Sequence, residues 1–315
     1  MTASPRFALL PKQSQKGVRV VMAARKKAPA VRPVPPTDVG AHAHKIAEAV
    51  AKAWHGSYGS GRLDVPLSVV STLAAAPQND SHGNDNTDAM ITWSPDDFFA
   101  FARMIWRAVI QERPEITALL YPLIAWIFED ADTELNSQAC AVSRAALRAR
   151  QLDLTGTDRR FDTDLLGTVL TVLRPASALK ARGQFYTPAC IAALLARMSD
   201  VEEHQAVEDP MVGTGGLFRA VAHVMRDVGR DPRTIQWVGC DIDELAVACA
   251  TVNSMIWGLG RDIVFHVGDA LTDDWKAAAL AQRDKLSQLA ADITRYRALF
   301  ALLDGYPVRD SDART

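Results

Sequence analysis

Apolar residues recur three and four positions apart through the first half of the chain, which is the period of a helix that buries one face. The predicted helices share this pattern and run from His42 to Gly56, near Pro66, from Ser94, after Pro114, and over residues 133–151 and 162–173. The polar run from Pro77 to Asp88 is predicted to be a surface loop. Apolar stripes at helical spacing are usually core, so we assign them to a helical core rather than to a ligand groove.

The pattern changes after residue 186, where helical stretches alternate with short apolar runs. Thr187-Pro188 is predicted to cap a helix whose apolar face consists of Ile191, Leu194, Leu195 and Met198. The elements expected next are a strand Ala206–Asp209, a helix Thr214–Val228, a strand Ile235–Cys240, a helix Leu245–Leu259 and a strand Ile263–Val267. This order implies parallel strands joined by right-handed crossovers, with ligands bound outside the carboxyl ends of the strands.

A long helix, 275–303, is predicted to follow. Its apolar residues alternate three and four apart, as in the seam of a coiled coil: Leu286, Leu289, Ile293, Tyr296, Phe300 and Leu303. Two interpretations fit this pattern. The helix packs against an incomplete sheet, or it binds a partner chain or a second copy of itself.

The chain is therefore expected to be α/β, with an all-helical domain over 41–178 and an incomplete Rossmann-like domain over 179–315. Residues 1–40 form a basic, proline-rich tail with a net charge of +7, and this composition predicts disorder. The tail is either a nucleic-acid arm or a solvated segment, and Met22 is an alternative start. The basic charge is confined to the tail, since residues 41–182 carry −3 and residues 183–315 carry −6.

Composition restricts the class of protein further. A chain of 315 residues with 48% hydrophobic residues can bury a sizeable core. No apolar run approaches the roughly 20 residues of a membrane helix, and no signal-like segment is present, so we expect no membrane association and a cytoplasmic protein. The four cysteines form no CxxC pair and are expected to be ordinary buried thiols, and no metal site is predicted.

Candidate chemistry lies in the second half, where a glycine turn follows the first predicted strand. The turn, Gly213-Thr214-Gly215-Gly216, lacks the third glycine of GxGxxG, and Asp209-Pro210 places a carboxylate before it. A phosphate site disfavours negative charge there, whereas a cofactor with a cationic amino group is stabilised by it. No GKS or GKT occurs, which disfavours a P-loop.

Four short segments occur in a fixed order: GQFYTP from Gly183, DPMVGTGG from Asp209, VGCDID from Val238 and GDAL from Gly268. In that order they resemble the adenine-N6 DNA methyltransferases, especially the modification subunits of type I restriction systems and related N-6 DNA methylases. The resemblance covers roughly residues 180–271, and four motifs in one order make it specific.

The resemblance implies an S-adenosylmethionine-dependent methyltransferase domain. The GQFYTP segment would hold the methionine end of the cofactor, through Phe185, Tyr186, Thr187 and Pro188. Asp209 and Pro210 would lie near its amino group, and the turn Gly213, Thr214, Gly215 and Gly216 would allow close backbone approach. Asp241 would accept from the ribose hydroxyls, Ile242 would pack on the adenine, and Asp269 with Ala270 would contact its amine. Asp243 is interpreted as a helix cap because it opens the next predicted helix.

The family holds its target base with a (Asp/Asn/Ser)-Pro-Pro-(Tyr/Phe/Trp) motif after the next strand, and this sequence lacks it. No Pro-Pro follows Pro35-Pro36, and Asp304-Gly305-Tyr306-Pro307 lacks the paired prolines. We therefore assign no catalytic residue. The expected function is cofactor binding by a DNA adenine-N6 methyltransferase-like protein of restriction-modification type that is inactive alone.

Two alternatives remain. The first is a non-enzymatic interaction protein derived from a methylase, which would bind a partner chain or nucleic acid, with DNA reached through that partner or through the basic tail. The second is a nicotinamide oxidoreductase, which is weaker because no catalytic Tyr-Lys or His-Asp arrangement is apparent.

Overall fold

The computed structural model describes residues 36–58, 61–129, 132–174, 187–271 and 274–304. Most of the basic tail and Gly183 to Tyr186 of the GQFYTP motif lie outside these residues, so the predictions for them stay predictions.

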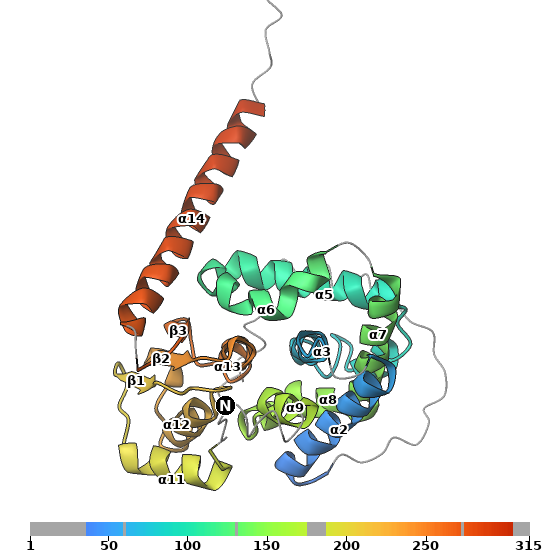
Figure 1. The fold of residues 1–315 in the computed structure, drawn as a ribbon, viewed down its shortest axis with the longest axis horizontal. Coiled ribbons are helices and arrows are strands. Elements are labelled where there is room, and N and C mark those ends of the chain that lie inside the picture. The colour runs from blue at the N-terminus through green and yellow to red at the C-terminus, as the bar shows by residue number, and fades with distance from the viewer. Residues whose placement is uncertain (1–35, 59–60, 130–131, 175–186, 272–273, 305–315) are drawn as a thin grey trace, which may run out of the picture.

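The N-terminal half is helical, as the apolar period predicted. Its elements are α2 (Val39–Tyr58), α3 (Asp64–Ala74), α4 (Asn86–Met90), α5 (Pro95–Glu112), η1 (Pro114–Ile116), α6 (Thr117–Phe128), α7 (Thr133–Arg148), α8 (Gln151–Thr155), η2 (Asp158–Phe161) and α9 (Leu165–Leu173). Helix α3 is buried along nearly its whole length and is surrounded by the other helices, as Figure 1 shows. It forms the centre of a helical layer.

Local chemistry explains the helix boundaries that differ from expectation. Helix α2 continues through Gly56, and Asp85 caps α4 inside the segment expected to be loop. The helix expected over 133–151 is divided because Arg150 adopts a left-handed φ of +68° between α7 and α8. Arg150 is fixed there by a hydrogen bond of 2.6 Å to Asp153.

The C-terminal half contains a three-stranded parallel sheet in the order β1-β2-β3, which confirms an α/β fold with a small parallel sheet. The elements are α11 (Ala189–Ser199), β1 (Ala206–Asp209), α12 (Gly216–Asp227), η3 (Pro232–Thr234), β2 (Gln236–Asp241), α13 (Glu244–Ile256), β3 (Ile263–Val267) and α14 (Trp275–Asp304). In the register, Asp209 pairs with Gly239 and Asp241 with Val267. The strands therefore end at a common edge.

One hydrophobic core joins the helical layer to the sheet. Helix α13 packs against both α6 and β3, and Trp237 of β2 belongs to the same buried cluster as Trp54 of α2. Arg113, at the end of α5, donates to the carbonyl of Arg261 at 3.0 Å. The two halves share a core, and the boundary expected near residue 178 stays a prediction.

The other face of the sheet is covered by the start of α14. Trp275 and Ala279 bury Val238, Cys240 and Val264 in a second, smaller cluster. Beyond these turns α14 extends away from the body of the protein (Figure 1). Packing against the sheet therefore accounts for the first part of this helix and not for the rest.

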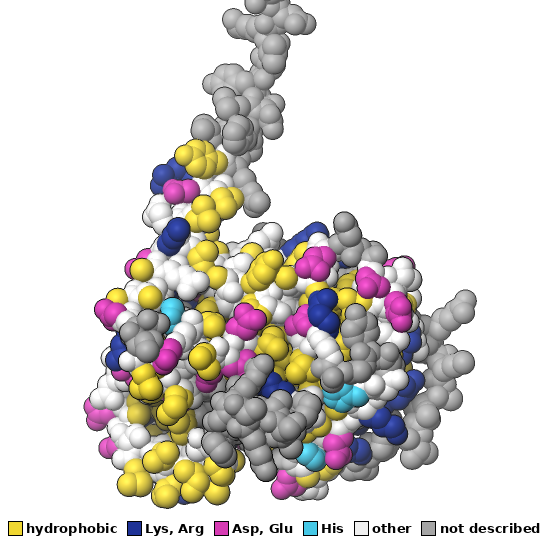
Figure 2. All heavy atoms as spheres, in the orientation of Figure 1, with side chains coloured by type: hydrophobic (Ala, Val, Ile, Leu, Met, Phe, Trp, Pro, Cys, Tyr) yellow, Lys and Arg dark blue, Asp and Glu magenta, His cyan; other side chains and the backbone are white. Residues whose placement is uncertain are grey.

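The orientation of α11 was wrongly predicted. The residues expected to form its buried face, Ile191, Leu194, Leu195 and Met198, are all exposed. Instead Ala192 and Ala196 are buried where α11 packs on α12. Small residues allow the two helices to approach closely, so the larger side chains face outward and contribute to the hydrophobic surface at the lower edge of Figure 2.

The cysteine prediction needs one correction. Cys140, Cys240 and Cys249 are buried free thiols, but Cys190 is exposed because it lies at the start of α11. In the part of the chain that the structure describes, no helix is both long enough and apolar enough to cross a membrane.

Candidate functional site

The carboxyl edge of the sheet brings together three loops that are far apart in sequence. Strands β1 and β2 end at Asp209 and Asp241, and β3 ends at Val267. Because the strands are parallel, the loops that follow them lie at one edge, where α/β proteins bind ligands. Three of the four sequence motifs meet here.

The glycine turn has a backbone that favours glycine. Gly213 and Gly215 adopt φ of +53° and +90°, which are left-handed values that glycine adopts without strain. The turn is closed by the Gly215 amide, which donates to Val212 O at 2.8 Å, and it is tied to β2 by the Val212 amide, which donates to Cys240 O at 2.9 Å. Gly216 then begins α12, and a Cβ placed there would meet no atom within 4 Å.

Asp241 connects the glycine turn to the loop after β2. Its Oδ2 accepts from the Gly213 amide and its Oδ1 from the Asp243 amide, both at 2.9 Å. Its main-chain carbonyl accepts from the Gly268 amide at 3.0 Å. One residue therefore contacts all three loops at the carboxyl edge.

Asp209 is a buried carboxylate beside this network, with 8% of its surface exposed. Burial raises its pKa above the ordinary value; the Met211 amide, which donates to it at 3.0 Å, acts in the opposite direction, and the charge of Asp241 adds to the rise. The sheet edge thus concentrates negative charge, which favours a cationic group in a ligand.

The other candidate residues occupy the rim. Ile242 is 74% exposed beside Asp241, which is the exposure expected of a side chain available to a flat apolar ligand. Asp269 is exposed and accepts from the Leu271 amide at 2.9 Å. Ala270 packs against the second cluster, under α14.

The remaining candidates lie farther along the chain or outside the described residues. Pro210 is exposed after β1, and Thr187 and Pro188 are exposed at the start of α11. Pro188 occupies the N-cap position without a side-chain hydrogen bond, so the expected Thr187-Pro188 cap is not formed by a side chain. Phe185 and Tyr186 fall outside the described residues. Among the residues that the structure places, no group of three or more His, Cys, Asp or Glu side chains is arranged to hold a metal ion.

Residues of the helical layer reach this site and were missed from the sequence. Half-buried Asp164 accepts from Thr214 Oγ1 and, at 2.8 Å, from Asn253 Nδ2. Arg174, at the other end of α9, pairs with Asp243, whose side chain also caps α13 by accepting from the Leu245 amide at 3.2 Å. The interpretation of Asp243 as a cap is confirmed, and its ion pair is additional.

Comparison with known families identifies the segment that contains this edge. Residues 162–291 match the family model described as N-6 DNA methylase. These residues are similar to that family and are called the methylase segment. The methylase segment includes the glycine turn, Asp241 and Asp269, and it also includes α9, which precedes the motifs that indicated the family.

A solved structure aligns with a larger part of the chain. It is the type I restriction-modification system methyltransferase subunit from Streptococcus thermophilus, with 16% sequence identity and a TM-score of 0.45. The alignment covers 76% of this chain and 60% of that subunit, so this chain spans about three fifths of its length. A search of curated proteins gave no match.

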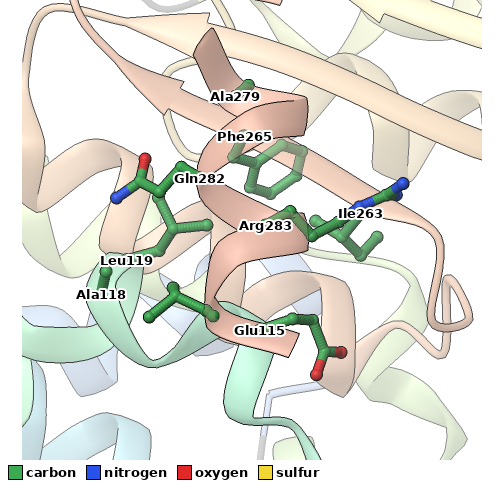
Figure 3. A pocket seen from close by; sticks show the side chains of 9 residues that line it. Glu115, Ala118, Leu119, Ile263, Phe265, Ala279, Gln282 and Arg283 are labelled. Atoms are coloured by element: carbon green, nitrogen blue, oxygen red, sulfur yellow. The ribbon is translucent and has the colours of Figure 1, made fainter. Parts of the chain in front are cut away.

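A small pocket between α6 and the methylase segment is separate from the carboxyl edge. It lies between β3, α6 and the first turns of α14, and Figure 3 shows Phe265, Leu119 and Ala279 facing it from these three elements. Its volume is about 10 Å³, which is about the minimum for one water molecule. This pocket is therefore a packing gap under α14 and too small for a nucleotide-sized ligand.

Proposed function

We propose that this chain binds S-adenosylmethionine at the carboxyl edge of its sheet, as part of a DNA adenine-N6 methyltransferase system of restriction-modification type. The observation that carries the proposal is the bonded unit of the glycine turn and Asp241, in which Gly213 donates to Asp241 at 2.9 Å. This arrangement lies within the N-6 DNA methylase segment. It places the Asp241 carboxylate directly beside the glycine turn, at one edge of the sheet.

Each loop would contact a different part of the cofactor. Asp241 still has lone pairs for the ribose hydroxyls, since each carboxylate oxygen can accept more than one hydrogen bond. Ile242 would cover the adenine, and Asp269 would accept from its amine. Buried Asp209 would neutralise the cationic methionine end. Phe185, Tyr186, Thr187 and Pro188 are proposed to close over that end.

We also propose that these 315 residues do not transfer a methyl group by themselves, because the sequence contains no Pro-Pro pair after Pro35-Pro36. The family's base-holding motif requires that pair. The test is an assay of labelled methyl transfer from S-adenosylmethionine to adenine in duplex DNA with the purified chain. Incorporation into adenine above a no-protein control would contradict this part of the proposal.

We propose that the sheet edge does not bind DNA directly. Residues 183–315 carry a net charge of −6, which opposes direct binding of phosphates. The basic residues 1–40 or a partner chain would supply the positive charge.

Asp209→Asn should stabilise the free protein while weakening cofactor binding. Because burial raises the pKa of Asp209, its contribution to stability is present below the unfolded-state pKa of about 3.9 and is lost as the pH rises through the folded-state pKa. At pH 7 the substitution removes a destabilising charge, so the Tm should rise by about 2 °C. Near pH 3 the difference in Tm should disappear.

The same variant should bind S-adenosylmethionine about tenfold more weakly, because it loses a charge-assisted contact. Thermal unfolding at both pH values and calorimetry at pH 7 measure the two effects. Asp227→Asn, at an exposed carboxylate in α12, is the control. A lower Tm for Asp209→Asn at pH 7, or unchanged affinity, would show that the buried charge is not reserved for the ligand.

A second candidate function is self-association through α14. The part of the helix that leaves the body exposes Leu289, Ile293 and Tyr296 by 53%, 43% and 59%. Their spacing is that of a two-stranded coiled coil, in which an identical helix supplies a matching seam. We therefore propose a second copy of the chain as the occupant of this seam.

The double variant Leu289→Glu/Ile293→Glu should convert a dimer to a monomer, because like charges would face each other across the seam. Light scattering over a range of protein concentrations measures the mass in solution. Gln288→Glu, which adds one negative charge at a neighbouring exposed position outside the seam, should remain dimeric. A monomeric wild-type chain at the highest soluble concentration would refute self-association and favour a different partner chain.

A further inference from the structure

Helix α9 is connected by polar side-chain contacts to two of the loops that form the candidate cofactor site. At its start, half-buried Asp164 accepts from the Gly167 amide at 2.8 Å, which caps the helix. The other carboxylate oxygen accepts from Thr214 Oγ1, inside the glycine turn. Asp164 therefore caps α9 and also holds Thr214, which lies between Gly213 and Gly215.

Asn253 of α13 completes this contact from the opposite side. Its side-chain amide donates to Asp164 Oδ1 at 2.8 Å and to the carbonyl of Thr214 at 2.9 Å. Thr214 is therefore held by both its side chain and its main chain. Asn253 is 1% exposed, so these bonds are made without competition from solvent.

The other end of α9 holds the loop after β2. Arg174 follows the last turn and forms a buried ion pair with Asp243. The Asp243 amide donates to Asp241 Oδ1 at 2.9 Å, so Arg174 is one residue removed from the carboxylate proposed to bind the ribose. The nine residues of α9 span about 13 Å and pack against α2, α3 and α13.

We propose that α9 is a positioning element of the cofactor site, which fixes the glycine turn through Asp164 and Asn253 and the Asp241 loop through Arg174 and Asp243. The inference rests on the proposed function. None of the three side chains Asp164, Asn253 and Arg174 needs to touch the ligand. The turn contains left-handed glycines at both sides of Thr214, and without these contacts it would sample conformations that do not match a rigid cofactor.

The first test compares Asn253→Ala with Ser254→Ala in the full chain. Both residues are buried in α13, but the Ser254 hydroxyl bonds only within that helix, to Thr251 O at 2.7 Å. Hydrogen exchange of peptides that contain residues 212–216 should become at least about tenfold faster in Asn253→Ala and stay unchanged in Ser254→Ala. Equal exchange of this turn in both variants would overturn the positioning role.

Calorimetry on the same proteins, under conditions where circular dichroism shows that both are folded, links the turn to the ligand. Asn253→Ala should raise the Kd for S-adenosylmethionine by about tenfold, and Ser254→Ala should change it by less than about twofold. Wild-type affinity in folded Asn253→Ala would overturn the proposal. If the wild-type chain itself binds no S-adenosylmethionine, the proposed function fails, and the exchange measurement still decides whether α9 positions the turn.

Arg174 provides an independent variant at the other end of the helix. Arg174→Gln leaves Asp243 buried without its charge partner and should raise the Kd by about tenfold, whereas Arg174→Lys restores the charge and should recover part of the affinity. Exchange of residues 241–245 should follow the same order. Equal exchange and equal Kd in Arg174→Gln and the wild type would remove Arg174 from the proposed role.

Discussion

Asp241→Ala should lower the affinity for S-adenosylmethionine by about a hundredfold, which is about 2.7 kcal/mol. The effect combines two losses. The carboxylate no longer accepts from the ribose hydroxyls, and the Gly213 and Asp243 amides lose the acceptor that joins their loops. Calorimetry with the folded variant measures the change in Kd.

Asp241→Asn separates these contributions. An asparagine keeps one carbonyl oxygen for a backbone amide but has no charge, so the loss should be smaller, about tenfold. Asp262→Asn is the control. Asp262 directly precedes β3, at the amino edge of the sheet, and pairs with Arg283 at 2.6 Å, so this substitution should leave the Kd unchanged. An Asp241→Ala protein that is folded and binds with the wild-type Kd would refute the assignment of this carboxylate.

Gly215→Ala should lower the free energy of unfolding by about 2 kcal/mol, because the site requires a left-handed backbone and has little room for a methyl group. Gly215 has a φ of +90°, and a Cβ there would lie 3.1 Å from the Trp257 ring. Trp257 is buried, so it can yield only by disturbing the core. Chemical denaturation followed by circular dichroism measures the loss.

Gly216→Ala is the matched control on the next residue. Its Cβ would enter open space, and the residue begins α12, so stability should stay within about 0.5 kcal/mol of the wild type or rise. Equal destabilisation by the two substitutions would contradict the claim that Gly215, and not Gly216, requires the absence of a side chain. Gly216→Ala should still weaken cofactor binding if the ligand lies against this backbone.

Local sequence signals were sufficient for the sheet and the glycine turn. The bounds of β1 and β3 match the predicted strands. β3 is an apolar run, and β1 ends where Pro210 and the glycine turn follow it. The glycines after β1 predicted a turn, and the structure adds that Gly213 and Gly215 adopt left-handed φ values. Asp243 caps α13 as its position before the helix indicated.

Contacts between distant segments could not be predicted in this way. An apolar period shows that α11 has two kinds of face, but the choice of Ala192 and Ala196 for the buried face depends on how closely α12 approaches. Asp164 and Asn253 are 89 residues apart in sequence. Asn253 is a polar residue in the apolar helix α13, and this position predicts that its side chain makes a buried hydrogen bond. The sequence does not predict which residue accepts that bond.

Helix α14 shows what apolar spacing predicts and what it leaves open. The apolar spacing of 275–303 fitted packing on the sheet and a coiled-coil seam equally well. In the structure, Trp275 and Ala279 pack on the sheet while Leu289, Ile293 and Tyr296 are exposed. The same apolar spacing therefore continues through a buried part and an exposed part of the helix. The position of the sheet decides where the buried part ends.

Calorimetric titration of the full wild-type chain with S-adenosylmethionine, S-adenosylhomocysteine and NAD⁺ tests the central claim most directly. We expect saturable binding of the first two at a single site, with binding of S-adenosylmethionine weakened by Asp241→Ala, and no comparable binding of NAD⁺. A folded wild-type chain that binds neither methyl cofactor nor its product, or that prefers the dinucleotide, would contradict it.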